Sequence, residues 1–154
     1  LTFASQRVWA SIRGTSPEAA VEIEVLAEQF AWNVRYPGPD GFFETADDVT
    51  TINQLHVPVG EPVLITLKSK DVIHSLFMPL LRVKHDAVPG LPSHVWFEAT
   101  APRQFEIACA ELCGLGHYRM RGFLTVETRA AFDAWMAAQV AAPAPVQAED
   151  APHP

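Results

Sequence analysis

The sequence predicts an all-β domain, an antiparallel sandwich or barrel, with one helix near its C-terminus. Apolar and polar residues alternate with a period of two in several short segments, as they do in half-buried strands. Turn signals that contain glycine or proline separate these segments, and only one stretch changes to helical spacing. Many short strands with such turns between them are typical of an antiparallel sandwich or barrel.

The first alternating segment starts at Val21, where Ile23 and Val25 follow with glutamates between them. Similar patterns predict strands over residues 63–68, 95–99, 105–107 and 123–126, with turn signals at residues 37–41, 59–60 and 89–90. Thr128 is a suitable N-cap for a helix over residues 128–140. Phe132, Trp135, Met136 and Val140 fall at helical spacing, and Trp135 and Met136 are expected to be packing residues.

The chain has 154 residues, which is the length of one domain. We assign residues 21–127 to that domain, residues 1–20 to a lead-in, and the Pro/Ala-rich residues 141–154 to a flexible tail. No apolar run approaches the roughly 18 residues that a membrane span requires.

The charge of the chain bears on its partners. Eleven basic and 18 acidic side chains give a net charge of −7. This balance argues against nucleic acid or an anionic membrane surface as a partner. It suits a basic protein partner, because complementary fields raise the rate of encounter.

The most informative feature is a short loop that contains the only two cysteines of the chain. Cys109 and Cys113 are followed by His117 and Met120, and His74 lies upstream in an apolar stretch. Thiolate, imidazole and thioether are together the ligands that soft copper prefers. A mononuclear blue-copper site uses one cysteine, so two cysteines in one loop indicate two metal ions bridged by two thiolates.

Two other interpretations of this loop remain open. The cysteines of an exported domain can form a disulfide, because oxidising compartments favour that bond. Two cysteines and two histidines also satisfy the four positions of a structural Cys2His2 zinc site. A disulfide gives no role to His74 and His117, and zinc gives none to Met120. Only copper uses all of these side chains.

Residues 21–140 resemble the dinuclear copper (CuA) domain of cytochrome c oxidase subunit II. The resemblance is carried by the motif C-x-E-x-C-G-x-x-H-x-x-M at residues 109–120 and by the stretches 29–36, 71–75 and 84–90. The copper domain of nitrous oxide reductase is similar but has tryptophan at the position of Glu111. Quinol-oxidase subunits keep the fold and lose the ligands, whereas every ligand position is filled here.

The resemblance implies a cupredoxin-like Greek-key sandwich or barrel and a set of copper ligands. Cys109 and Cys113 would bridge two copper ions, and His74 and His117 would each bind one of them. Met120 would be a weak ligand of one copper. Weak ligation of the other would come from the backbone carbonyl of Glu111.

The family's function is implied in the same way. The chain would be the electron-transfer subunit of a haem-copper cytochrome c oxidase, taking electrons from a c-type cytochrome and passing them to haem in subunit I. There oxygen is reduced and protons are pumped. The complex would be anchored in the membrane through segments absent from this chain, with this domain on the outer, periplasmic or extracytoplasmic face. Because members of the family have membrane helices before the copper domain, residues 1–20 would be the exit of such a helix. The side chain of Glu111 would help to bind a magnesium ion shared with subunit I, and Asp86 lies in the stretch that faces that subunit.

One departure from the family concerns the place where electrons enter. Where the family has a tryptophan above the copper site, this chain has Phe30, and Trp32 follows two residues later. Residues two apart in a strand share a face, so both would lie on one side of the sheet. We expect Phe30 to be a packing contact in a docking patch, Trp32 a core or interface residue, and Asp71 an acidic docking residue. No ligand role is assigned to the other histidines, which are His56, His85, His94 and His153.

Overall fold

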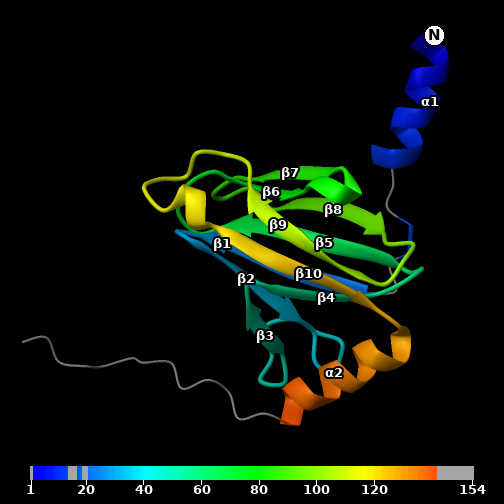
Figure 1. Ribbon diagram of the computed structural model, residues 1–154, viewed down its shortest axis with the longest axis vertical. Coiled ribbons are helices and arrows are strands. Elements are labelled where there is room, and N and C mark those ends of the chain that lie inside the picture. The colour runs from blue at the N-terminus through cyan, green and yellow to red at the C-terminus, as the bar shows by residue number, and fades with distance from the viewer. Residues whose placement is uncertain (1, 14–16, 19–20, 142–154) are drawn as a thin grey trace, which may run out of the picture.

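Two five-stranded sheets pack face to face in a computed structural model that describes residues 2–13, 17–18 and 21–141 (Figure 1). The first sheet has the order β3 (Val49–Ile52), β2 (Ala31–Tyr36), β1 (Val21–Glu28), β5 (Pro62–Ser69) and β8 (Ser93–Glu98). The second has the order β4 (Gln54–Pro58), β10 (Arg121–Glu127), β9 (Arg103–Cys109), β6 (His74–Met78) and β7 (Val83–Ala87). The expected β-sandwich is confirmed.

The sheets are mixed, so the expectation of purely antiparallel pairing is wrong in two places. β1 pairs with β5 and β4 pairs with β10 in parallel, while the other strand pairs are antiparallel. A parallel pair needs a long crossover connection. The chain provides one in each case, because the intervening strands include members of the opposite sheet.

The strands predicted from alternation are β1, β5, β8, β9 and β10, and all five form. In β1 the buried residues are Val21, Ile23, Val25 and Ala27, which face the core. The alternation did not predict the other five strands, which are β2, β3, β4, β6 and β7. Of these, β3 and β4 are short, and β6 is buried at four of its five positions. A strand that is buried on both faces does not alternate between apolar and polar residues, so alternation does not predict it.

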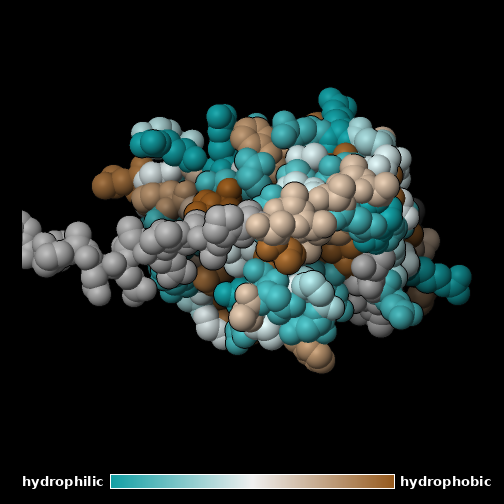
Figure 2. All heavy atoms as spheres, turned by 90° about the horizontal axis from the view of Figure 1, so that it is seen from below, coloured by the Kyte–Doolittle hydropathy of each residue, from teal (hydrophilic) through white to brown (hydrophobic). Residues whose placement is uncertain are grey.

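The C-terminal helix α2 (Arg129–Ala141) packs against β3 and β4 and starts at the predicted cap. Thr128 Oγ1 accepts a hydrogen bond from the backbone N–H of Ala131 at 3.3 Å. Phe132 is buried, and Trp135 and Met136 pack against the core. In Figure 2 the view is onto the side of the molecule where α2 lies, and hydrophilic residues cover much of that face. The helix closes one end of the sandwich.

The lead-in contains a further helix, α1 (Thr2–Arg13), which stands away from the sandwich (Figure 1). Its exposed residues include Phe3, Val8 and Trp9. Within the described parts of the chain, no helix combines the length and the apolar character needed to cross a membrane. The tail was predicted for residues 141–154. Ala141 instead belongs to α2, and residues 142–154 lie outside the described residues.

Candidate metal centre

Both cysteines lie where β9 passes into the loop that leads to β10. Cys109 is the last residue of β9, and its backbone N–H donates to the carbonyl of Met120 at 3.1 Å, which closes the loop at its base. The next residue, Ala110, donates to the carbonyl of Ser75 at 3.0 Å. This bond ties the loop to β6, whose first residue is His74. The fold thereby places the upstream histidine beside the cysteine loop.

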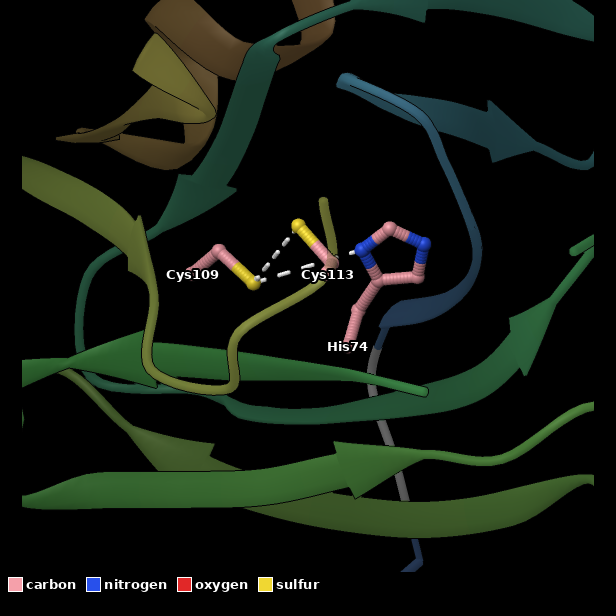
Figure 3. A group of neighbouring side chains, drawn as sticks. All are labelled: His74, Cys109 and Cys113. Atoms are coloured by element: carbon pink, nitrogen blue, oxygen red, sulfur yellow. Dashed lines mark hydrogen bonds between the residues drawn. The ribbon is translucent and has the colours of Figure 1, made fainter. Parts of the chain in front are cut away.

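Each of the two cysteine sulfur atoms lies near a different imidazole ring. Cys109 Sγ and Cys113 Sγ are 3.8 Å apart. His74 Nδ1 lies 4.0 Å from Cys109 Sγ, and His117 Nδ1 lies 3.6 Å from Cys113 Sγ. Figure 3 shows Cys109, Cys113 and His74 converging on one point, and their ligand atoms all lie within 4.8 Å of one another.

The two weaker donors of the expected set are also at the cluster. Met120 Sδ lies 3.7 Å from Cys113 Sγ, and the carbonyl oxygen of Glu111 lies 3.2 Å from Cys109 Sγ. The side chain of Met120 is buried, whereas that of Glu111 is exposed. The structure therefore brings together all six donor groups that the sequence analysis named.

Burial controls the chemistry of the thiols. Both cysteines are free, and their sulfur separation of 3.8 Å is far longer than the roughly 2.05 Å of a disulfide. Desolvation, followed by the neighbouring Cys109 thiol, raises the pKa of Cys113 to about 11. Cys113 thus keeps its proton at neutral pH in the metal-free protein. Metal binding must displace that proton, because the thiolate is the binding form.

Asp71 holds the imidazole of His74 in place. Its Oδ1 lies 2.8 Å from His74 Nε2, and the same carboxylate accepts backbone hydrogen bonds from Gln29 and Val72. Burial raises the pKa of Asp71, but these three hydrogen bonds outweigh it and leave that pKa below its usual value. A carboxylate at one ring nitrogen leaves the other free for a metal, and Nδ1 is the nitrogen that faces Cys109.

The inference that placed Phe30 and Trp32 on one strand face does not hold, because it treated both as strand residues. Phe30 lies in the turn before β2, where the strand alternation does not apply, and it is half-buried against the cysteine loop. Trp32 is completely buried, with its ring edge-on to His74 at a centroid distance of 6.3 Å. Trp32 is therefore a core residue, and its burial removes it from any docking surface.

The remaining predicted residues lie outside the cluster. Asp86, on β7, accepts hydrogen bonds from Lys84 Nζ at 2.8 Å and from Ser75 Oγ at 2.6 Å, which lower its pKa. His56 Nδ1 pairs with Glu127 and His94 Nδ1 with Thr66, while His153 lies outside the described residues.

Sequence reasoning gave no role to Gln29. Its side-chain amide donates to the carbonyl of Cys113 at 2.6 Å. The two residues are 84 positions apart in the sequence, and no pattern within a short segment predicts such a contact.

The donor set fits copper better than zinc. Two thiols, two imidazole nitrogens and a thioether surround one small volume, and the thioether of Met120 is 2% exposed. Soft sulfur ligands of this kind select copper. A structural zinc site would use four of these groups and leave the buried thioether unused.

Comparisons with known proteins identify the family of the chain. The family model for the cytochrome c oxidase subunit II periplasmic domain matches residues 39–127. The alternative cytochrome c oxidase subunit 2 of Bradyrhizobium diazoefficiens is 35% identical over 81% of this chain and 53% of its own length. The cytochrome c oxidase subunit 2 of Alkalihalophilus pseudofirmus is 40% identical over 80% of this chain and 34% of its own length.

Solved structures show the same fold. The periplasmic domain of cytochrome oxidase subunit II (CoxB) of Bradyrhizobium japonicum superposes with a TM-score of 0.72 at 26% identity, covering 81% of this chain and 96% of that domain. A second match is a subunit II domain captured in a mixed disulfide with the thioredoxin-like protein TlpA, with a TM-score of 0.67 at 27% identity, covering 80% of this chain and 94% of that one.

The two-sheet fold and its buried Cys/His cluster define a cupredoxin-like domain with a candidate copper site. The chain belongs to the cytochrome c oxidase subunit II periplasmic domain family. It spans 53% and 34% of the two curated relatives named above, so it corresponds to a part of those proteins.

Proposed function

We propose that this domain holds two copper ions and carries electrons for a haem-copper cytochrome c oxidase. The observation that supports two ions is the pairing of each sulfur with a different imidazole across a sulfur–sulfur distance of 3.8 Å. The two imidazoles lie against different sulfurs, so each of two ions would use its own imidazole and share the sulfurs.

Each residue then has a defined task. Cys109 and Cys113 would hold the ions as thiolates, and His74 and His117 would each supply an imidazole to one of them. Met120 and the carbonyl of Glu111 are weak donors at opposite sides, because they lie against different sulfurs. Bound copper would supply a centre that accepts and releases one electron at a time.

The protein contributes a fixed geometry. His74 is held by Asp71 and starts a strand, while Cys109 ends the neighbouring strand. Backbone hydrogen bonds close the loop at Met120 and join it to β6. Donors on such rigid elements move little when the charge of the site changes, which favours fast electron transfer.

The partners follow from the family. Electrons would come from a c-type cytochrome and pass to haem in subunit I, where oxygen is reduced and protons are pumped. The domain would lie on the outer face of the membrane, anchored by segments outside this chain. The exposed carboxylate of Glu111 would take part in a magnesium site shared with subunit I, and Asp86 would face that subunit.

A thioredoxin-like protein is a further proposed partner, by analogy with the captured subunit II complex. Copper requires both cysteines in the reduced state, and their sulfurs are close enough for small movements to join them in a disulfide. A dithiol partner would reduce such a disulfide to two thiols and become a disulfide itself, and the two thiols can then lose their protons to bind copper.

The decisive measurement is metal content with electron paramagnetic resonance of the copper-loaded domain. We expect two coppers per chain that share one unpaired electron. Cys113→Ser should abolish this spectrum, whereas Met120→Leu should retain both coppers and shift the reduction potential. A protein that matures with one zinc and no copper would contradict the proposal, as would a stable Cys109–Cys113 disulfide that excludes metal.

The proposed cytochrome partner has its own test. The net charge of −7 should speed the encounter with a basic cytochrome at low salt. The association rate should fall as ionic strength approaches physiological values, where screening acts over roughly 8–10 Å. A rate that does not depend on salt would show that apolar contacts alone guide docking.

A further inference from the structure

The turn between β1 and β2 contacts both segments that carry the candidate ligands. The turn consists of Gln29 and Phe30, and it belongs to the first sheet. His74 and the cysteine loop extend from strands of the second sheet. The turn therefore reaches across the sandwich to the metal-binding end.

On one side, the turn is bonded to the His74 segment. The backbone N–H of Gln29 donates to Asp71 Oδ2 at 2.8 Å. The other oxygen of that carboxylate lies 2.8 Å from His74 Nε2. Asp71 thus links the turn to the imidazole through its two oxygen atoms. An amide in its place has only one acceptor oxygen and cannot serve both N–H groups.

On the other side, the turn is bonded to the cysteine loop. Gln29 Nε2 donates to the carbonyl of Cys113 at 2.6 Å in a partly buried position. A Cβ atom at Gly114 would lie 2.7 Å from this same Nε2, and Gly114 has a φ of +132° that side chains disfavour. Glycine at this position is what allows the amide to approach the loop.

Phe30 adds an apolar contact to the same loop. A Cβ atom at Gly116 would lie only 2.3 Å from Phe30 Cδ2, so the ring rests directly on the glycine backbone. Gly116 has an ordinary φ of −90°. The absence of a side chain, not an unusual backbone, is what this contact requires.

We propose that Gln29 is a positioning residue of the copper site, which fixes the Cys113–His117 segment relative to His74 by bonding to both sides at once. This rests on the proposed copper function. Through its backbone the residue acts on Asp71 and His74, and through its side chain it acts on Cys113. The two halves of the donor set are thereby held at a constant separation.

The test compares Gln29→Met with Gln104→Met. Methionine matches the length of glutamine but cannot donate a hydrogen bond. Gln104 lies on β9 away from the loop, exposed, with its amide 3.5 Å from Thr125 Oγ1, so the control makes the same substitution at a remote position with a weaker contact. Copper loss to a competing chelator should be about fivefold to tenfold faster in Gln29→Met, the effect of losing one hydrogen bond of ordinary strength. Gln104→Met should match the parent protein.

Amide hydrogen exchange supplies a readout that needs no copper. In the metal-free Gln29→Met protein, exchange should speed up at residues 113–117 and also at residues 71–74. Acceleration at both segments distinguishes a link between them from a local effect on the loop. If Gln29→Met does not fold, Gln29→Asn, whose amide is too short to reach the carbonyl, replaces it in both measurements.

Two results would overturn the positioning role. One is copper loss at the parental rate with unchanged exchange in both segments. The other is faster exchange in the loop alone, which would reduce Gln29 to a local contact. A parent protein that binds no copper would refute the proposed function instead, and the exchange measurement would still decide the role of Gln29.

Discussion

Two regions of this sandwich each contain a histidine paired with a carboxylate: the end with the cysteine loop, which we call the metal end, and the end covered by α2. Only the metal end also contains the other donor groups of a metal site. His74 Nε2 lies 2.8 Å from Asp71, and His56 Nδ1 lies 2.9 Å from Glu127. The difference is what the second ring nitrogen meets. In His74 this nitrogen faces Cys109 Sγ at 4.0 Å, whereas among the described residues His56 and Glu127 belong to no group of three or more side chains that could hold a metal.

The surroundings of His56 are aromatic. Its ring stacks on that of Trp135 at a centroid distance of 4.1 Å and an interplanar angle of 5°. The hydroxyl of Tyr36 accepts from the backbone N–H of His56 and donates to its carbonyl. Tyr36 also packs edge-on against Trp135. His56 thus holds α2 against the sandwich. A histidine–carboxylate pair orients a ring, and the neighbouring groups decide whether that ring binds metal or packs.

The largest expected effect is a difference in copper content between variants of the two histidines. His74→Ala should reduce copper from two ions per chain to fewer than one, because it removes a strong ligand. His56→Ala should retain both coppers and lower the melting temperature, because it removes the stacking contact with Trp135. Metal analysis and thermal unfolding of the two variants check this. Equal copper loss in both would mean that the two ends are coupled.

Helix α2 should contribute to the stability of the fold and not to metal binding. Phe132 is 5% exposed and packs near Tyr36 and Trp135. Phe132→Ala should lower the free energy of unfolding by about 3–5 kcal/mol, the usual cost of deleting a buried ring. Val140, on the same helix, is 48% exposed, so Val140→Ala should cost about 0.5 kcal/mol or less. Denaturant titration measures both values, and the copper spectrum should be unchanged.

The two ends also differ in how far the sequence predicted them. Helix α2 was predicted because its cap and its spacing are local signals, starting from Thr128 and Phe132. The candidate ligands in the cysteine loop were predicted because Cys109, Cys113 and Met120 lie within one short segment whose residue types point to copper. Their meeting with His74 was expected only through resemblance to a known family.

Contacts between distant segments were not predictable in this way. The parallel pairing of β1 with β5 depends on which sheet the intervening strands join, and residue alternation does not contain that information. The roles of Gln29 and Asp71 depend on bonds that cross from one sheet to the other. Phe30 was misplaced because a two-residue period was extended into a turn.

Alkaline pH should act on the two ends in succession in the metal-free protein. The folded state raises the pKa of Cys113 from its usual value near 9 to about 11, first by burial and then through Cys109. Between these values the unfolded state has lost a proton that the folded state keeps. The free energy of unfolding should therefore fall as pH rises from about 9, by roughly 2–3 kcal/mol at pH 11.

Tyr36 provides the comparison at the other end. Burial raises its pKa far above the usual 10, so its effect on stability should begin only near pH 10. Denaturant titrations at successive pH values should show the early fall in the parent protein and not in Cys113→Ser. Tyr36→Phe should instead remove the later fall. An early fall that persists in Cys113→Ser would assign it to another group.

The smallest expected effect concerns Phe30, an aromatic residue at the metal end. We compare it with Trp135, the aromatic residue that stacks on His56 at the other end. Phe30 is half-buried and rests on Gly116. Phe30→Leu keeps most of the apolar contact, so it should cost about 1 kcal/mol of stability. If the ring only packs, electron transfer from a reduced c-type cytochrome should stay within about threefold of the parent rate at equal copper content.

Trp32→Phe is the matched variant, because Trp32 is buried beside His74 and its Nε1 has no hydrogen-bond partner among the described residues. Phenylalanine removes this unpaired N–H and keeps an aromatic ring, so this variant too should transfer electrons at nearly the parent rate. A hundredfold slower transfer in Phe30→Leu, with cytochrome binding and copper content unchanged, would contradict the packing role. The ring of Phe30 would then belong to the electron path, and the aromatic residues at the two ends would differ in function as the two histidines do.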